Sequence, residues 1–381
     1  MTTPLSSPPP RKGARDRFYR VFTYQSVDRP PDIEFGYWPQ TIRRWLAEGL
    51  PLELTEAEQN SMFLRKLDDF FGFEHEGAGL NLRLGMDPPF EEKVIERKEG
   101  SVVMRGADGI TAERFLNDSE QSSIPHFLKF PVETPDDWAE LKQRFRYDDP
   151  IRDIPDEAVD CVRSAAAEGK AVSTSVCGPY GQLRHWMGFE NLSMAFYDYP
   201  EMVHEMVEHW SGLAVQQMES LPDDVIIDRV DWWEDMAGRN GPFVGPAMFR
   251  EFLQPCYHRV MSAARKRGCV LGLVDSDGNP HDIVGNWLEE GVNIMFPLEV
   301  AAGVDPFAWR EEFGSDLRLR GGIDKRAVAA GPQAVDAELQ RIRPLLDQGG
   351  VIPHLDHLVP PDISYDNYRY YLDAKRRLIG K

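Results

Sequence analysis

The C-terminal half of the chain alternates between two hydrophobic patterns. Apolar runs of strand length begin at Cys269, Val292, Leu317 and Val351. Segments with apolar residues at every third or fourth position occupy 281–291, 305–314, 334–350 and 364–379. Gly291, Gly314 and Gly349 each precede a new apolar run, where a helix commonly ends in a left-handed residue. Alternating strand and helix patterns predict a βαβα series and therefore a parallel sheet.

Earlier segments extend this series. Strand patterns are expected at 171–176 and 225–233, joined by a long helical region at 192–221. Residues 101–115 carry apolar residues on either side of an Asp-Gly turn, with valines before it, which predicts a hairpin inserted between units. Since no Gly- or Ser-rich linker divides the chain, we expect one domain over 13–381, preceded by a flexible Pro/Ser tail at 1–12. The expected fold is a single (β/α)₈ TIM barrel with an N-terminal extension and a hairpin insertion.

Composition excludes several classes of partner. The 381 residues carry a formal net charge of −20, which repels nucleic acid and anionic membrane surfaces. The first residues lack the apolar core of a signal peptide, and no apolar stretch is long enough to span a membrane. The four cysteines are widely spaced, with no C-x-x-C pair, so we expect buried thiols in a cytoplasmic protein.

Acids and histidines follow the predicted strands. In a TIM barrel the reactive groups come from the strand C-termini and the loops after them, so we expect these side chains to meet at one rim. The residues in question are Glu234, Asp235, Asp275, Asp277, Glu299, Asp324, His354, Asp356 and His357.

The Asp-x-Asp-Gly-Asn segment that starts at Asp275 is the most informative of these. In an extended chain Asp275 and Asp277 point to the same side, where they repel each other unless a cation or a shared proton lies between them. The same composition also occurs in ordinary turns. Structural alternatives exist elsewhere too, because Asp324 can cap the helix that follows it and His354 can form a satisfied pair with Asp356.

Six segments in order resemble the uroporphyrinogen decarboxylase superfamily. They are RDRFYRVFTYQSVDRPP (15–31), GPYGQLRHWMGFENL (178–192), EDMAGRNGPFVGPAMFREFLQP (234–255), the strand ending in DSDGN, LRGGIDK (319–325) and DHLVPPDISYDNYRYYL (356–372). The resemblance covers nearly the whole chain and implies a single (β/α)₈ barrel.

The superfamily contains cofactor-free decarboxylases and corrinoid-linked methyltransferases. The decarboxylases carry an arginine-bearing RQAGRYLPE segment that grips substrate carboxylates, whereas this chain has IEFGYWPQTIRRW, in which Glu34 adds a repulsive charge. The methyltransferases hold zinc with an H-x-C pair and a later Cys. This chain instead offers Asp275-x-Asp277 followed by His354 or Asp356, a set that suits a harder cation or zinc with oxygen chemistry.

The resemblance therefore favours methyl transfer from a small O- or N-methyl compound to a corrinoid held by a separate protein. Asp275 and Asp277 would bind a divalent metal or share a proton, His354 would be the third ligand or an acid, and Glu234 would position the substrate. Further expected substrate contacts are Tyr180, Trp233, Arg239, Glu299 and Asn279.

Two other functions stay open. A decarboxylase that needs no cofactor would face its substrate carboxylate with Arg184, Arg239 or Lys325. A non-catalytic barrel would bind its ligand without turnover. Relatives of this fold often pair, so a homodimer is also an expectation.

Overall fold

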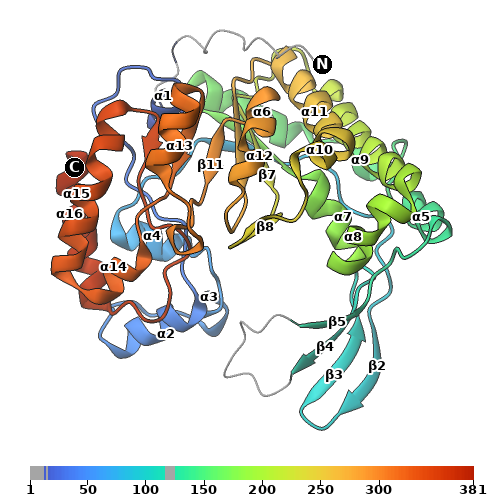
Figure 1. Cartoon of the computed structure of the whole chain (residues 1–381), viewed down its shortest axis with the longest axis horizontal. Helices are drawn as coiled ribbons and strands as arrows, with labels where there is room; N and C mark the ends of the chain where they lie inside the picture. The colour runs from blue at the N-terminus through green and yellow to red at the C-terminus, as the bar shows by residue number, and fades with distance from the viewer. Residues whose placement is uncertain (1–12, 14–15, 116–124) are drawn as a thin grey trace.

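A seven-stranded parallel sheet forms the centre of the computed structural model, which describes residue 13 and residues 16–115 and 125–381 (Figure 1). The expected tail at 1–12 lies outside the described residues. In spatial order the strands are β1 (Ala78–Leu80), β6 (Val172–Cys177), β7 (Arg229–Trp233), β10 (Leu271–Asp275), β11 (Ile294–Phe296), β12 (Arg318–Arg320) and β13 (Val351–Ile352). All neighbouring pairs are parallel, which confirms the predicted α/β organisation.

Helices surround this sheet (Figure 1). They are α1 (Arg17–Phe22), α2 (Pro39–Ala47), α3 (Glu56–Gln59), α4 (Arg65–Phe71), α5 (Pro135–Leu141), α6 (Asp156–Ala167), α7 (Pro179–Met187), α8 (Phe189–Asp198), α9 (Pro200–Ser220), α10 (Pro246–Met248), α11 (Gln254–Lys266), α12 (His281–Glu289), α13 (Pro306–Phe313), α14 (Lys325–Ala330), α15 (Pro332–Gln348) and α16 (Tyr365–Ile379). The predicted helix at 192–221 is thus two helices. Pro200 starts the second one, because proline has no N–H to continue the first but fits an N-terminal turn.

The predicted helix ends at Gly291, Gly314 and Gly349 are confirmed, since all three have positive φ. At Gly291 space adds a second constraint. A Cβ there would lie 2.0 Å from Nη2 of Arg265, so a larger residue would displace that side chain.

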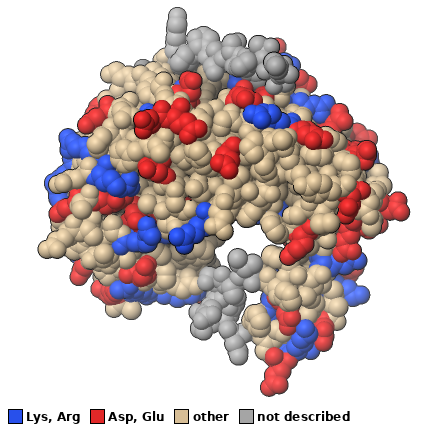
Figure 2. Space-filling model, in the orientation of Figure 1, with Lys and Arg blue, Asp and Glu red and all other residues tan. Residues whose placement is uncertain are grey.

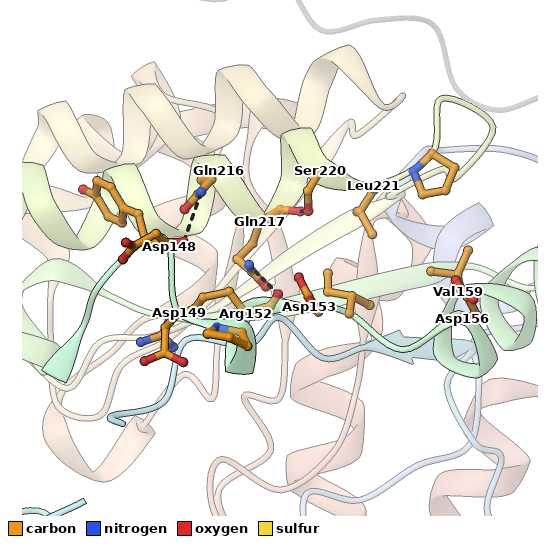
Figure 3. Close-up of a pocket in the computed structure, with 14 residues that line it drawn as sticks. Asp148, Asp149, Arg152, Asp153, Asp156, Val159, Gln216, Gln217, Ser220 and Leu221 are labelled. Carbon is orange, nitrogen blue, oxygen red and sulfur yellow. Dashed lines mark hydrogen bonds between the residues drawn. The ribbon is translucent and has the colours of Figure 1, made fainter. Parts of the chain in front are cut away.

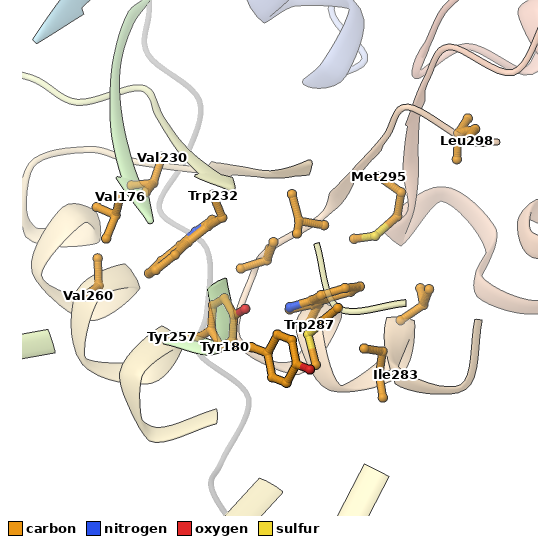
Figure 4. Close-up of a cluster of buried hydrophobic side chains, with 14 of the residues drawn as sticks. Val176, Tyr180, Val230, Trp232, Tyr257, Val260, Ile283, Trp287, Met295 and Leu298 are labelled. Atoms are coloured by element: carbon orange, nitrogen blue, oxygen red, sulfur yellow. The ribbon is translucent and has the colours of Figure 1, made fainter. Parts of the chain in front are cut away.

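Two hydrophobic cores lie on opposite faces of the sheet. Val176, Val230 and Trp232 belong to the outer core under the helices (Figure 4). The smaller inner core joins Leu273 and Phe296 to residues of α1, Ile33 and Ile352. Helix α1 lies at the end where the strands begin, because Arg318 donates to the carbonyl of Phe22 and Ala171 donates to Asp16.

Residues 32–37 contact both edges of the sheet. Tyr37 forms a parallel bridge with Val359, beyond β13, and the N–H of Glu74, before β1, donates to the carbonyl of Asp32 at 2.9 Å. This arrangement is compatible with the predicted TIM barrel. In the part of the chain that the structure describes, seven strands rather than eight form the parallel sheet.

The predicted hairpin insertion is larger than the sequence indicated. Its two strands are β3 (Ser101–Arg105) and β4 (Thr111–Phe115), which pair antiparallel as expected. They are flanked by β2 (Lys93–Lys98) and β5 (His126–Lys129), giving a four-stranded antiparallel insertion sheet. The insertion follows β1, so it leaves from the end of the barrel where strands finish, and Figure 2 shows open space between it and the body of the molecule.

A buried ion cluster fastens the last helix to residues 32–37. Lys375 of α16 lies 3.0 Å from Asp32 and 2.6 Å from Glu34, and all three side chains are fully buried. Tyr371 also donates to Glu34 at 2.7 Å. The prediction that Glu34 repels a substrate is therefore wrong, because this carboxylate points into the protein and is paired.

The cysteines only partly follow the prediction. Cys256 and Cys269 are buried, but Cys161 is exposed on α6. Within residues 16–115 and 125–381, no helix combines the length and apolar character needed to cross a membrane.

Replacing Lys375 with Met should strongly destabilise the fold, because it leaves the buried carboxylates of Asp32 and Glu34 without their shared cation. We expect a loss of about 3–5 kcal/mol in the free energy of unfolding, measured with urea. Lys66→Met, which removes a surface pair with Glu58, should cost less than about 1 kcal/mol. Equal losses in the two variants would contradict the structural role of the cluster.

Candidate active site

Carboxylates from separate strand ends converge at the predicted rim. Ligand atoms of Asp235, Asp275 and Asp277 all lie within 4.8 Å of one another, and so do those of Asp277, Glu299 and His357. Asp277 belongs to both groups, so the five residues form one acid cluster. It unites side chains that follow β7, β10, β11 and β13.

The loop after β10 is shaped to hold Asp277 in the middle of this cluster. The N–H of Asp277 donates to Oδ1 of Asp235 at 3.2 Å, and the N–H of Gly278 donates to Oε2 of Glu299 at 2.9 Å. Gly278 has a φ of +79°, and a Cβ there would lie 2.5 Å from the carbonyl oxygen of Ala237. Only glycine fits this close approach of the β10 loop to the β7 loop.

Mutual repulsion changes the acidity of the cluster. Burial and the neighbouring Asp277 raise the pKa of Asp235 to about 6. Burial, followed by repulsion from Asp235 and Asp277, raises the pKa of Asp275 well above that of a free aspartate. The Asp275 carboxyl has no hydrogen-bond or ion-pair partner among the described residues. A bound cation or a retained proton relieves such repulsion.

His357 supplies the imidazole of the cluster. Its Nε2 lies 3.4 Å from Oδ2 of Asp277, and its ring stacks on Trp38 at 6.1 Å between centroids. Burial opposes the imidazolium, but the interaction with Asp277 outweighs it and raises the pKa of His357. Sequence reasoning placed His357 at the rim without giving it a role.

His354 belongs to neither group of cluster residues. Its Nδ1 lies 2.6 Å from the carbonyl oxygen of Leu355, and because a carbonyl only accepts, Nδ1 carries the proton and Nε2 a lone pair. Burial and nearby Arg320 lower the pKa of His354 well below its ordinary value. The structure thus gives no support to His354 as an acid or as a ligand beside Asp275, and His357 lies where that ligand was expected.

Glu234 is also placed differently from the prediction. It is fully buried and accepts hydrogen bonds from the N–H groups of Tyr180 at 2.8 Å and Gly181 at 3.3 Å, at the start of α7. A Cβ on Gly178 would lie 1.4 Å from Oε2 of Glu234, so this packing requires glycine. Burial raises the pKa of Glu234 to about 8. Glu234 fastens α7 to the end of β7, and Asp235 occupies the rim instead.

Of the two aromatic residues expected to contact the substrate, Tyr180 and Trp233, only Trp233 is exposed. Tyr180 and Trp232 lie in the buried cluster of Figure 4, away from solvent. Trp233 is 37% exposed and carries the guanidinium of Arg184 5.3 Å from its ring centroid. The burial of the other two follows from their positions on the side of the sheet that the helices cover.

The remaining candidates divide between rim and support. Glu299 is in the cluster and pairs with Lys325 at 3.4 Å, and Arg239 is exposed. Asn279 stabilises its own loop, since its Oδ1 accepts the N–H of His281. Asp324 caps α14, as the structural alternative predicted.

Asp356 is a buried structural acid. Its two oxygens accept the N–H groups of Val300 at 3.0 Å and Lys325 at 3.1 Å, which tie the loops after β11 and β12 together. The alternative that His354 and Asp356 form a satisfied pair with each other is not what the structure shows, because Asp356 is satisfied by backbone donors.

Sequence reasoning missed a set of charges inside the barrel. Arg229 contacts Asp231 and Glu76 at 2.5 Å each, and Arg320 contacts Glu76 at 2.6 Å. The available signal was the alternation of Arg229 and Asp231 along an otherwise apolar strand, which places both on one face.

A surface cleft elsewhere is a weaker candidate. Figure 3 shows it between residues 148–156 and the end of α9, with Arg152 and Gln217 in its wall. The Arg152 guanidinium donates to the carbonyls of Arg83 and Gly85, and Gln217 donates to the carbonyl of Arg152. These polar groups are used in holding the chain together, and no metal-like group of side chains occurs there among the described residues.

The shifted pKa of Glu234 predicts a pH dependence of stability in metal-free protein. The pKa rises from 4.5 to about 8 on folding, so the folded state binds this proton more tightly and stability falls as pH increases between about 5 and 8. Glu234→Gln cannot titrate. It should reduce the difference in the free energy of unfolding between pH 5 and pH 8 by on the order of a few kcal/mol, measured by urea unfolding in EDTA.

Glu168→Gln is the matched control for this experiment. Glu168 is an exposed acid whose pKa is lowered by Lys170, so it titrates below the pH window and its variant should keep the wild-type slope. An unchanged slope in Glu234→Gln would show that the buried carboxyl does not hold a proton.

Comparisons with known proteins agree with the geometry. The family model described as Uroporphyrinogen decarboxylase (URO-D) matches residues 117–378, which is more than half of the chain. Among solved structures, the chain is similar to a methyltransferase from Methanosarcina mazei, with a TM-score of 0.55 and 14% identity over 95% of this chain and 97% of that chain. At this identity the likeness establishes the fold alone. No curated protein matches the chain. Because the family model matches more than half of the chain, from the region of β5 to α16, the chain belongs to the uroporphyrinogen decarboxylase family.

Proposed function

We propose that this protein is a methyltransferase that moves a methyl group from a small O- or N-methyl compound to a corrinoid held by a separate protein. The observation that carries the proposal is the acid cluster, in which Asp277 is shared by two groups of potential ligands. Support also comes from the similarity in fold to a methyltransferase. The eight-stranded closure of the barrel through residues 32–37, and pairing into a homodimer, are parts of the same proposal.

The cluster residues fit a divalent metal. Asp277, Glu299 and His357 offer two carboxylates and one imidazole, and Asp235 with Asp275 adds further oxygen atoms. The unpartnered carboxyl of Asp275 is the feature that a cation would satisfy. This donor set suits zinc or a harder cation, without the thiolates that favour transfer to sulfur. When bound, such a metal would supply Lewis acidity to the atom that loses the methyl group.

The chain's own groups can meet the charge that methyl transfer creates. As the bond from carbon to oxygen or nitrogen breaks, its electron pair remains on the donor atom, which then needs a proton. Without a bound metal, Asp275 is suited to supply that proton because burial and repulsion raise its pKa. Arg184, which donates to the carbonyl of Asp235 at 2.7 Å, and Lys325, beside Glu299, keep the rim acids in position.

Decarboxylation is less well supported. Of its three candidate cations, Arg184 and Lys325 already serve Asp235 and Glu299, and Arg239 is exposed. Arg44 is likewise paired with Glu48 on the outside of α2. A carboxylate substrate would therefore meet a rim dominated by acids and would be repelled.

Mixing the protein with cob(I)alamin and a panel of methoxylated and methylamine compounds should produce methylcobalamin, followed by absorbance. Release of carbon dioxide from an acid, without methylcobalamin from any donor, would favour the decarboxylase instead. Binding of a donor with no turnover of either kind would favour the non-catalytic barrel.

Metal content should depend on Asp277. We expect Asp277→Asn to weaken metal binding by at least about 10- to 100-fold, measured by elemental analysis after dialysis against limiting metal. Asp282→Asn removes a nearby exposed acid of α12 outside the cluster and should leave metal content unchanged. Equal metal in wild type and Asp277→Asn would remove the ligand role.

A further inference from the structure

The inner face of β6, which points into the interior of the barrel, is open to solvent. Val172, Thr174 and Val176 are buried against the helices, whereas Ser175 is exposed although it lies in the middle of a central strand. Because the outer face of β6 is covered by the outer core, Ser175 can reach solvent only from the inner face.

The strands on either side continue the opening. On β1, Gly79 is exposed, and a Cβ added to it would have nothing within 4 Å. On β7, Asp231 and Trp233 are partly exposed while Val230 and Trp232 are buried. Sheet register places Ser175 beside Asp231, and Gly79 beside Ser173.

These inner residues define a lumen pocket, lined by Gly79, Ser175, Cys177, Asp231 and Trp233. The opposite part of the interior is filled, since Leu273, Phe296 and His354 are buried. The hollow therefore belongs to the β1–β6–β7 side of the barrel.

The charges of the lumen pocket favour particular ligands. The side chains of Asp231 and Glu76 are 23% and 27% exposed, but their cationic partners Arg229 and Arg320 are only 10% and 14% exposed. Carboxylate oxygens and the hydroxyl of Ser175, which has no hydrogen-bond partner among the described residues, thus face the hollow, with the guanidinium groups behind them. Such a wall accepts hydrogen bonds from a ligand and repels a carboxylate.

The lumen pocket lies directly under the acid cluster. Register pairs Leu273 with Asp231 and Asp275 with Trp233, so Asp275 lies two residues further toward the rim than Asp231. Two residues of strand span about 7 Å. A molecule about one ring long can therefore reach from Asp231 to the rim.

We propose that the lumen pocket binds the body of the methyl donor, and that this donor is a neutral or cationic molecule with hydroxyl or amine groups. The inference rests on the proposed function and specifies its substrate class. Ser175 and Asp231 accept the hydrogen bonds of the donor, Trp233 covers one side of it, and its methyl group lies at the acid cluster.

Gly79→Leu tests the pocket by filling it. The position is in a strand, has no positive φ and faces open space, so leucine fits without strain. We expect an unchanged melting temperature and a KM for the methyl donor raised at least 10-fold. Gly85→Leu, at a second open glycine outside the pocket, should leave KM unchanged. An unchanged KM in Gly79→Leu, with methyl transfer intact, would overturn the pocket and leave the proposed function standing.

Thiol labelling tests the pocket without relying on activity. In a Cys161→Ser background, we expect Ser175→Cys to react at least 10-fold faster with the cationic aminoethyl methanethiosulfonate than with the anionic sulfonatoethyl reagent. This ratio of labelling rates is first divided by the ratio of the same two rates at Cys161 of the wild type, which is exposed. Adding Gly79→Leu should block both reactions, and Cys161→Ser alone gives the background.

The labelling outcomes separate the two proposals. Slow labelling that Gly79→Leu does not change, or a preference for the anionic reagent, would overturn the lumen pocket or its ligand class. Labelling as expected in a protein that transfers no methyl group from any donor would refute the proposed function and leave the pocket in place.

Discussion

Repulsion among carboxylates at the ends of β7 and β10 is the constraint around which the rest of the site is arranged. Asp235, Asp275 and Asp277 have ligand atoms within 4.8 Å of one another, and burial together with this repulsion raises the pKa values of Asp235 and Asp275. A parallel sheet favours this proximity, because its strands all deliver their carboxyl ends to one edge. Hydrogen bonds between the loops hold the carboxylates together against this repulsion, and a proton or a cation removes it.

Glycines at two positions let neighbouring loops approach closely and so hold the acid cluster in place. Gly178 leaves room for Glu234 to accept the first N–H groups of α7, and Gly278 lets the β10 loop touch the β7 loop. Helix α7 in turn carries Arg184, which holds the backbone of Asp235. Buried Asp356 connects the loops after β11 and β12 in the same way. These contacts connect the loops that carry the acids, which suits a site that must keep like charges together.

Sequence reasoning predicted the parallel sheet well because apolar runs and helix-ending glycines are local signals, as the series from β10 to β13 shows. It also predicted that Asp275 and Asp277 meet. It could not predict which side chains after the strand ends are buried and which lie at the rim. Glu234 continues the outward parity of Val230 and Trp232 and goes under α7, whereas Asp235 continues the inward parity of Asp231 and Trp233. His354 and His357 both follow the last strand, and the sequence did not distinguish them. The turn of the chain after β13 buries His354 and places His357 in the acid cluster.

The same parity rule explains why the barrel interior is polar on one side. Ser175, Asp231 and Trp233 all take inward positions, and bulky apolar residues take the inward positions of β10 and β11. Leu273 and Phe296 fill one side of the interior, and α1 covers the end where the strands begin. Together they form the inner hydrophobic core. The other half can then be spared for a ligand, provided that its buried charges are balanced. Arg229 and Arg320 supply that balance from behind the carboxylates, so the pocket wall presents acceptor oxygens without leaving a buried charge unpaired.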